Sequence, residues 1–117
     1  MSYTPPDEEA LFDVYDSARA IVDFASDMDR ESLAHDRRTW SAILREITVI
    51  GEATKRLSAE FRAAHPDKAW SRMAGMRDVT VHGYDIIDFD EVWDVAHRDA
   101  SNLVGYLEPL LPHPFED

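Results

Sequence analysis

Apolar residues recur three and four positions apart over long stretches of the chain, which is the spacing of one helix face. The first stretch predicts a helix over about residues 7–28, with apolar positions at Leu11, Val14, Tyr15, Ala18, Ile21, Val22 and Ala25. Acidic residues follow Pro5 and Pro6, and they suit the positive end of a helix dipole. The pattern breaks at residues 27–30, where Asp29 or Ser32 is predicted to cap a short turn.

A second apolar stripe predicts a helix over about residues 36–64, through Trp40, Ile43, Leu44, Ile47, Ile50, Gly51, Thr54, Leu57 and Phe61. Gly51 and Thr54 are poor helix formers in its middle. Such small residues on the stripe indicate that another helix approaches closely there. The helix is predicted to end at His65, because the residue before a proline is pushed out of the α region.

The rest of the chain predicts a single turn over residues 70–73, a helix over 75–82 that ends at Gly83, and a last helix. Asp88 or Asp90 is predicted to cap that last helix, and Pro109 lies near its end. No segment alternates with period two, so we expect no strand. The pattern predicts an all-α fold in one domain, residues 1–117: an up-and-down bundle of four main helices plus a short helical turn.

Composition narrows the class of protein. The chain has 117 residues, of which 44% are hydrophobic and 31% charged, as in a soluble globular domain. No apolar run approaches the roughly 20 residues of a membrane span, and the acidic start does not resemble a secretory signal. There are no cysteines, which excludes disulfides and thiol nucleophiles. We therefore expect a cytoplasmic protein that does not bind membranes.

Charge is unevenly distributed along the chain. A net charge of −12 argues at first against binding a polyanion. However, residues 30–77 hold ten of the twelve bases and carry a net +4, whereas residues 1–29 and 78–117 carry −7 and −9. The local field decides binding within about 8–10 Å. The basic middle can therefore face phosphate, although a solvated helix that carries arginines accounts for it equally well.

The segment 76–84 combines the side chains that metal-free RNA cleavage requires. Arg77 supplies a permanently charged fork that matches phosphate, and His82 titrates near neutral pH. One group removes the proton of the 2′-hydroxyl, another protonates the leaving 5′-oxygen, and the arginine stabilises the charged transition state. The two side chains lie roughly 140° apart on one helix. The long stem of the arginine can still reach around the helix, and a cleft formed by two chains can bring copies of the two side chains together.

A structural role for the same residues is the alternative, and spacing alone favours it. His82 suits the negative end of a helix dipole, Arg77 has acids nearby in Asp78 and Asp85, and Tyr84 can pack. His65, His97 and His113 show no metal-ligand spacing, so we expect no metal and no cofactor. The tryptophans, Trp40, Trp70 and Trp93, are expected to anchor the core or a dimer rather than to stack on bases.

Several motifs occur in a fixed order: Asp36-Arg37-Arg38-Thr39, Ile50-Gly51-Glu52-Ala53, His65-Pro66, Gly75-Met76-Arg77-Asp78, Val81-His82-Gly83-Tyr84 and Val92-Trp93. Over roughly residues 7–111 this order resembles the HepT-like family of HEPN proteins. The resemblance implies that the protein is a homodimeric helical bundle. It also implies that the protein is a toxin encoded beside a minimal nucleotidyltransferase antitoxin. It also implies that Arg77 and His82 are the ribonuclease residues and that the antitoxin attaches AMP to Tyr84.

Four further positions have less certain roles in that resemblance. Asp78 stands where relatives commonly carry Asn, so it either orients Arg77 or weakens its hold on phosphate. Glu52 is expected to hydrogen-bond Arg77 or His82, or to be a surface glutamate. Arg37 and Arg38 are expected to hold RNA phosphates or the antitoxin, or to be solvated.

The sequence thus predicts a metal-independent toxin endoribonuclease that acts on single-stranded or loop RNA. In-line attack needs a flexible backbone, which a duplex resists. One alternative is a non-catalytic scaffold that binds nucleotides or the nucleotidyltransferase. Another is a structural dimer whose motif only packs.

Overall fold

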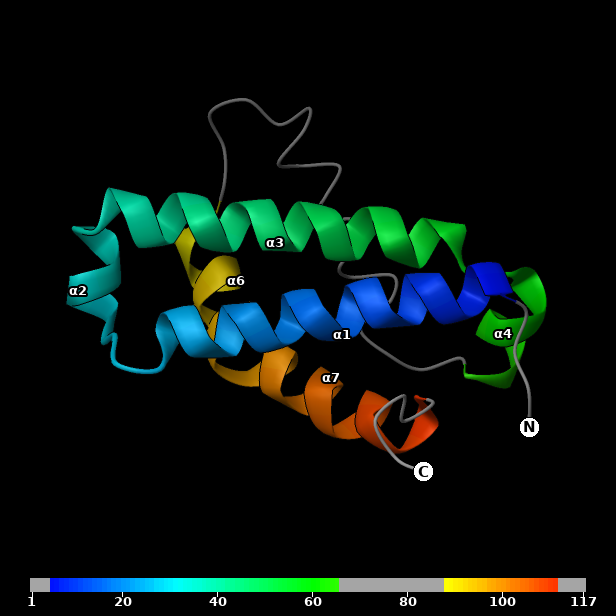
Figure 1. Cartoon of the computed structure of the whole chain (residues 1–117). Coiled ribbons are helices and arrows are strands. Elements are labelled where there is room, and N and C mark those ends of the chain that lie inside the picture. Colours follow the sequence, from blue (N-terminus) through cyan, green and yellow to red (C-terminus); the bar gives the residue numbers. More distant parts are fainter. Residues whose placement is uncertain (1–4, 66–87, 112–117) are drawn as a thin grey trace.

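A computed structural model describes residues 5–65 and 88–111, and all their regular elements are helical (Figure 1). The elements before residue 66 are α1 (Pro5–Ala25), α2 (Arg30–Ala34), α3 (Arg37–Arg56) and α4 (Ala59–Ala64). Those after residue 87 are α6 (Phe89–Asp94), the π-helical turn η1 (Val95–Asp99), α7 (Ala100–Leu107) and the 3-10 turn η2 (Glu108–Leu110). The prediction of an all-α fold is confirmed.

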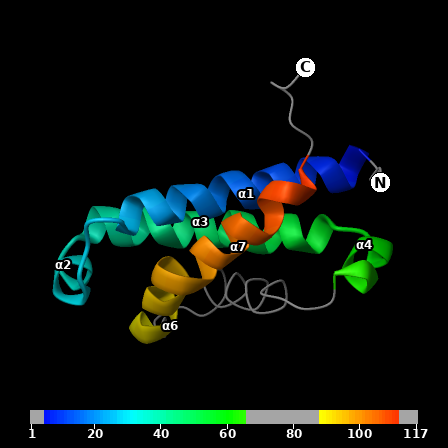
Figure 2. The same cartoon turned by 90° about the horizontal axis from the view of Figure 1, so that it is seen from below.

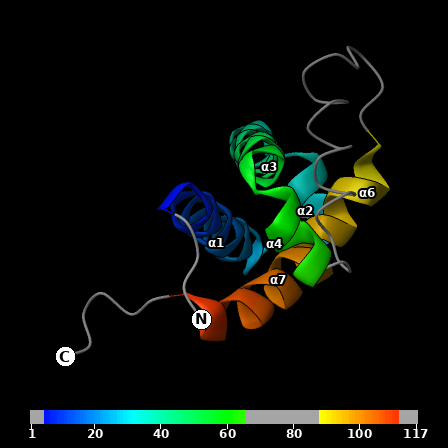
Figure 3. The ribbon, with the colours of Figure 1, turned by 90° about the vertical axis from the view of Figure 1, so that its right-hand side faces the viewer.

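The two long helices α1 and α3 lie antiparallel and side by side, and α7 packs along another side of α1 (Figures 1 and 3). Their facing stripes are fully buried: Leu11, Val14, Ala18 and Ile21 on α1, and Ile43, Ile47 and Ile50 on α3. Burying one such aliphatic side chain contributes about 1.5–3 kcal/mol. The predicted apolar stripes therefore form the core. Gly51 and Thr54 are buried with them, as expected of small residues on this stripe.

Short helices close the two ends of the α1–α3 pair (Figure 2). At one end, the chain leaves α1 at Ala25, three residues before the predicted end, and turns into α2. Asp29 caps α2, because its carboxylate accepts a hydrogen bond from the Ser32 N–H at 2.7 Å. Of the two candidate caps, Asp29 and Ser32, the structure thus selects Asp29.

The prediction of one helix over residues 36–64 was wrong. Leu57 is extended, with φ −66° and ψ 141°, and it separates α3 from α4. Ser58 then caps α4 by accepting a hydrogen bond from the Phe61 N–H at 3.0 Å. The break was hidden because Leu57 and Phe61 are both buried, so the apolar spacing continues across it.

The last helix is continuous in the chain from α6 through η1 to α7, but its middle turn is π-helical. Asp88 caps it by accepting a hydrogen bond from the Asp90 N–H at 2.9 Å, which selects Asp88 over Asp90. The wide turn η1 still buries Val95 and Ala96 in the core. Apolar spacing does not distinguish one π turn from an α turn, so the sequence did not predict it.

Among residues 5–65 and 88–111, no helix has the length and apolar character needed to cross a bilayer. The predicted turn at 70–73 and the predicted helix at 75–82 lie outside these residues.

Candidate functional site

The predicted site residues fall into two groups. Arg77, Asp78, His82 and Tyr84 lie outside the residues that the structure describes. Arg37, Arg38 and Glu52 lie on α3 and are exposed. The structure therefore gives the geometry only for Arg37, Arg38 and Glu52 and for the elements that pack around α3.

The first turn of α3 positions Arg37 and Arg38. Asp36 caps this helix, because its carboxylate accepts hydrogen bonds from the N–H of Thr39 at 3.0 Å and from its hydroxyl at 2.9 Å. These two hydrogen bonds hold the pKa of Asp36 below its ordinary value, and the charge of Arg38 adds a smaller effect in the same direction. The carboxylate is thus an ionised helix cap beside two exposed guanidinium groups.

Arg37 and Arg38 differ from other arginines of α3 in their ion pairing. Arg45 pairs with Glu46 at 3.5 Å, and Arg56 pairs with Asp13 on α1. Among the residues that the structure describes, no carboxylate forms an ion pair with Arg37 or Arg38. Both guanidinium groups are therefore available to an anion.

Glu52 lies far from these two arginines. It follows Arg37 by fifteen residues of one helix, which is about 22 Å along the helix axis. The structure therefore does not bring Glu52 together with Arg37 and Arg38 around one phosphate. Whether Glu52 contacts Arg77 or His82 lies outside the described residues.

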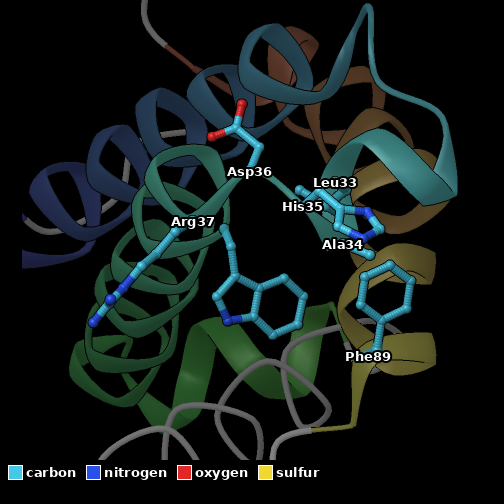
Figure 4. A pocket seen from close by; sticks show the side chains of 7 residues that line it. Leu33, Ala34, His35, Asp36, Arg37 and Phe89 are labelled. Carbon is cyan, nitrogen blue, oxygen red and sulfur yellow. The ribbon is translucent and has the colours of Figure 1, made fainter.

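A pocket of about 380 Å³ lies beside Arg37, where the end of α2, the start of α3 and the start of α6 meet (Figure 4). Its lining residues are Leu33, Ala34, His35, Asp36, Arg37, Trp40 and Phe89. The rings of Trp40 and Phe89 are nearly parallel, 6° apart, with their centroids separated by 5.5 Å. In Figure 4 the Asp36 carboxylate and the Arg37 side chain extend to different sides.

The aromatic row continues along α6 beyond the pocket. Trp93 stacks on Phe89 with centroids 6.4 Å apart, and His97 stacks on Trp93 at 3.6 Å. The guanidinium of Arg30 lies over both Phe89 and Trp93, at 5.2 and 5.5 Å from the ring centroids, and it also pairs with Asp90. Trp93 is therefore a half-buried anchor that holds α2 and α6 together.

The prediction that the tryptophans anchor the core is confirmed for two of them, and the structure does not test whether they also stack on bases. Trp40 and Trp93 are partly buried and pack against the core, and Trp70 lies outside the described residues. The sequence did not reveal that Trp40 also lines a pocket with His35 and Phe89. Phe89 is far from His35 and Trp40 in the sequence, so no local spacing connects it to them. In residues 5–65 and 88–111, no cluster of three or more His, Asp or Glu has the arrangement of a metal site.

Most of the chain, from α1 to α7, is similar to known proteins. The family model described as "Ribonuclease HepT-like" matches residues 14–110. "Putative RNase MJ0127" of Methanocaldococcus jannaschii is 32% identical over 86% of this chain and 84% of its own length. "Probable ribonuclease HepT" of Thermococcus cleftensis is 31% identical over 88% of this chain and 94% of its own.

A third relative, "Putative RNase TTE0752" of Caldanaerobacter subterraneus, is 28% identical over 78% of this chain. No solved structure matches the chain significantly. The family match covers most of the chain and includes the segment that holds Arg77, His82 and Tyr84. The resemblance stated from the motifs is therefore confirmed: the chain belongs to the HepT-like ribonuclease family.

Proposed function

We propose that this protein is a metal-independent endoribonuclease and the toxin of a toxin–antitoxin pair. The observation that carries the proposal is the family match over residues 14–110, which spans a complete Arg-x4-His-x-Tyr motif at Arg77, His82 and Tyr84. The ribonuclease names of the relatives support the same reaction.

The chemistry requires only side chains. A base takes the proton of the 2′-hydroxyl, and the freed oxygen attacks the adjacent phosphorus. The bond from phosphorus to the 5′-oxygen breaks as an acid protonates that oxygen, which leaves a 2′,3′-cyclic phosphate. His82 is the group of the motif that titrates near neutral pH, and Arg77 stabilises the extra negative charge in the transition state. The reaction gains and loses no electrons and needs no metal.

We further propose that the protein works as a homodimer whose two motifs converge on one cleft. Arg77 and His82 are about 140° apart if they share one helix, so a single copy presents them on different sides. A second copy supplies the missing partner. In this arrangement Asp78 orients Arg77, and Glu52 supports Arg77 or His82 from α3.

Arg37 and Arg38 extend the RNA path in this proposal. Both are exposed, and neither forms an ion pair within the described residues. Tyr84 precedes Phe89 by five residues, and five residues of chain span at most about 18 Å. Because Phe89 and Arg37 line the same pocket, the motif and the two arginines are expected to contact neighbouring nucleotides of one strand.

Silencing by a nucleotidyltransferase antitoxin completes the proposal. The phenol oxygen of Tyr84 would attack the α-phosphorus of ATP, pyrophosphate would leave, and the phenol proton would pass to solvent. The added AMP brings a phosphate to the region where Arg77 should hold RNA. The block would then be both steric and electrostatic.

The test is cleavage of single-stranded RNA by the purified protein in the presence of EDTA. Arg77→Ala and His82→Ala are each expected to lower the rate by about 100-fold or more. The matched control is Arg98→Ala, because Arg98 is an exposed arginine of η1 that pairs with Asp94 and Asp99. Circular dichroism should give the same folded spectrum for all four proteins. Cleavage by His82→Ala at the wild-type rate would overturn the proposal.

A non-catalytic scaffold that binds only the nucleotidyltransferase is the second candidate. The observation in its favour is the strongly negative charge of residues 1–29 and 78–117, which repels RNA. A protein that binds the partner and never cleaves RNA under any of these conditions would support the scaffold.

A further inference from the structure

The pocket between α2, α3 and α6 combines aromatic surface with an exposed cation. Trp40 and Phe89 are both half-buried, so part of each ring is accessible. Arg37 lies at the same pocket and is exposed. The volume of about 380 Å³ lies at the lower end of the usual range for small-ligand sites, about 300–1,000 Å³. The pocket therefore suits one flat ring system that carries a negative charge.

Two arginines at the start of α3 provide a place for an anion despite the net charge of the chain. Three carboxylates of these segments are held by the protein: Asp36 by Thr39, Asp88 by the Asp90 N–H, and Asp90 by Arg30. Arg37 and Arg38 have no such partner among the described residues. Arg37 and Arg38 are therefore the two cations at the start of α3 with which a phosphate can pair.

His35 adds a polar atom to the pocket. Its Nδ1 lies 2.9 Å from the carbonyl oxygen of Glu31, and because a carbonyl only accepts, Nδ1 must donate. In the neutral ring this leaves Nε2 as an acceptor. An acceptor at the edge of an aromatic pocket can take a hydrogen bond from the amino or imino edge of a base.

We propose that this pocket is a nucleobase subsite for the RNA substrate, in which a base lies against Trp40 and Phe89 and a flanking phosphate contacts Arg37. This inference rests on the proposed ribonuclease function, and it identifies residues that would hold the RNA strand. A base within a duplex has both faces stacked on its neighbours, so only an unpaired nucleotide can enter. The subsite thus selects single-stranded or loop RNA.

The experiment measures binding rather than cleavage. The probe is a fluorescein-labelled, single-stranded 2′-O-methyl RNA nonamer, which lacks the 2′-hydroxyl nucleophile, and anisotropy gives its Kd for the full-length protein. Trp40→Ala is expected to weaken binding about tenfold or more, whereas Trp40→Phe, which keeps a stacking ring, should stay within about threefold. Arg37→Ala should weaken binding about tenfold and reduce the salt slope by about one unit.

Arg45→Ala is the matched control, because Arg45 lies on the same helix and is exposed but pairs with Glu46. Its Kd should change by less than about threefold. Equal losses for Arg37→Ala and Arg45→Ala would overturn the subsite in favour of nonspecific charge attraction. A self-complementary 2′-O-methyl duplex should compete poorly, and a duplex that competes as well as the single strand would contradict the proposal.

The wild-type protein provides a second measurement, which does not depend on the folding of Trp40→Ala. A nonamer with one 4-thiouridine, irradiated in complex with the wild-type protein, should crosslink to Trp40 or Phe89 and be mapped by mass spectrometry. Crosslinks confined to other parts of the chain would overturn the proposal. The proposal would also be overturned if variants of Trp40 and Arg37 bound RNA as the wild type does but no longer bound a nucleotidyltransferase partner.

These results separate the subsite from the proposed function. A protein that binds the nonamer through Trp40 and Arg37 but cleaves no RNA would retain the subsite and lose the ribonuclease. A protein that cleaves RNA with unchanged affinity in Trp40→Ala and Arg37→Ala would retain the ribonuclease and lose the subsite.

Discussion

The carboxylate of Asp7 accepts two hydrogen bonds from Ser58, one from its backbone N–H at 2.8 Å and one from its hydroxyl at 2.7 Å. The same hydroxyl accepts the Phe61 N–H and caps α4. Asp7 is only 4% exposed, so this contact ties the first turn of α1 to the start of α4 in a nearly dry environment. It fixes where α4 starts relative to α1.

Ser58→Ala removes both the helix cap and one donor to Asp7. The free energy of unfolding is expected to fall by about 1–3 kcal/mol, because a lost cap and a weakened buried hydrogen bond act together. Urea denaturation followed by circular dichroism measures it. Ser41→Ala, a change at an exposed serine of α3, should stay within about 0.5 kcal/mol. Equal midpoints for the two variants would show that the Asp7–Ser58 contact contributes nothing.

The core between α1 and α3 gives a second prediction. Ile47 is fully buried, and Ile47→Ala is expected to destabilise the protein by about 2–5 kcal/mol through lost burial and the cavity left behind. Thermal unfolding measures the change. Phe24→Ala is the control, because Phe24 is 40% exposed on α1, and its loss should be much smaller. A smaller loss for Ile47→Ala than for Phe24→Ala would contradict this packing.

The helix caps predict how stability depends on pH. Hydrogen bonds from Ser32 and from Thr39 hold the pKa values of Asp29 and Asp36 below their ordinary value of 3.8. Since the folded pKa is the lower one, this stabilisation is complete well above pH 3.8 and is lost as the pH falls through the folded pKa. Unfolding in urea at a series of pH values between 7 and 2.5 should show the decline.

Asp36→Ser isolates one of these carboxylates, because serine also caps helices but does not titrate. Its stability should fall less steeply with acid than that of the wild type. Asp27→Ser, at an exposed position outside the caps, is the matched control. Parallel curves for Asp36→Ser and the wild type would rule out the cap as a source of acid sensitivity.

How much the sequence revealed depended on whether a feature is local. Spacing of apolar residues predicted α1, α3 and the last helix. The sequence left Asp29 or Ser32 as the cap before α2 and Asp88 or Asp90 as the cap of the last helix, and the structure selects Asp29 and Asp88. The same spacing concealed the break at Leu57 and Ser58, since burial continues on both sides. A backbone turn with an apolar residue at its corner leaves no gap in such a pattern.

The candidate site was predictable only where a motif is contiguous in the chain. Arg77, His82 and Tyr84 were recognised from their order, and their geometry stays a prediction. The pocket at Trp40 was not predictable, because it forms only when Phe89 is brought against residues 33–40. Pockets of this kind depend on tertiary packing, which spacing along one helix does not encode.

Silencing through Tyr84 is a prediction about the partner enzyme. With ATP and the nucleotidyltransferase, the wild-type chain should gain the mass of one or more AMP groups and lose RNA cleavage. Tyr84→Phe should gain none and stay active. Tyr106→Phe is the matched control, because Tyr106 is half-buried and hydrogen-bonds His65 at 2.6 Å. An adduct on Tyr84→Phe equal to that on the wild type would exclude Tyr84 as the acceptor.

The 2′-hydroxyl of the substrate provides the most direct test of the central claim, that side chains of this protein activate it as the nucleophile. Two single strands of the same sequence are incubated with the protein in EDTA: all-ribose RNA and RNA with 2′-O-methyl groups throughout. We predict that only the ribose strand is cut and that its products end in 2′,3′-cyclic phosphates. Cleavage of the 2′-O-methyl strand at a comparable rate would contradict the account.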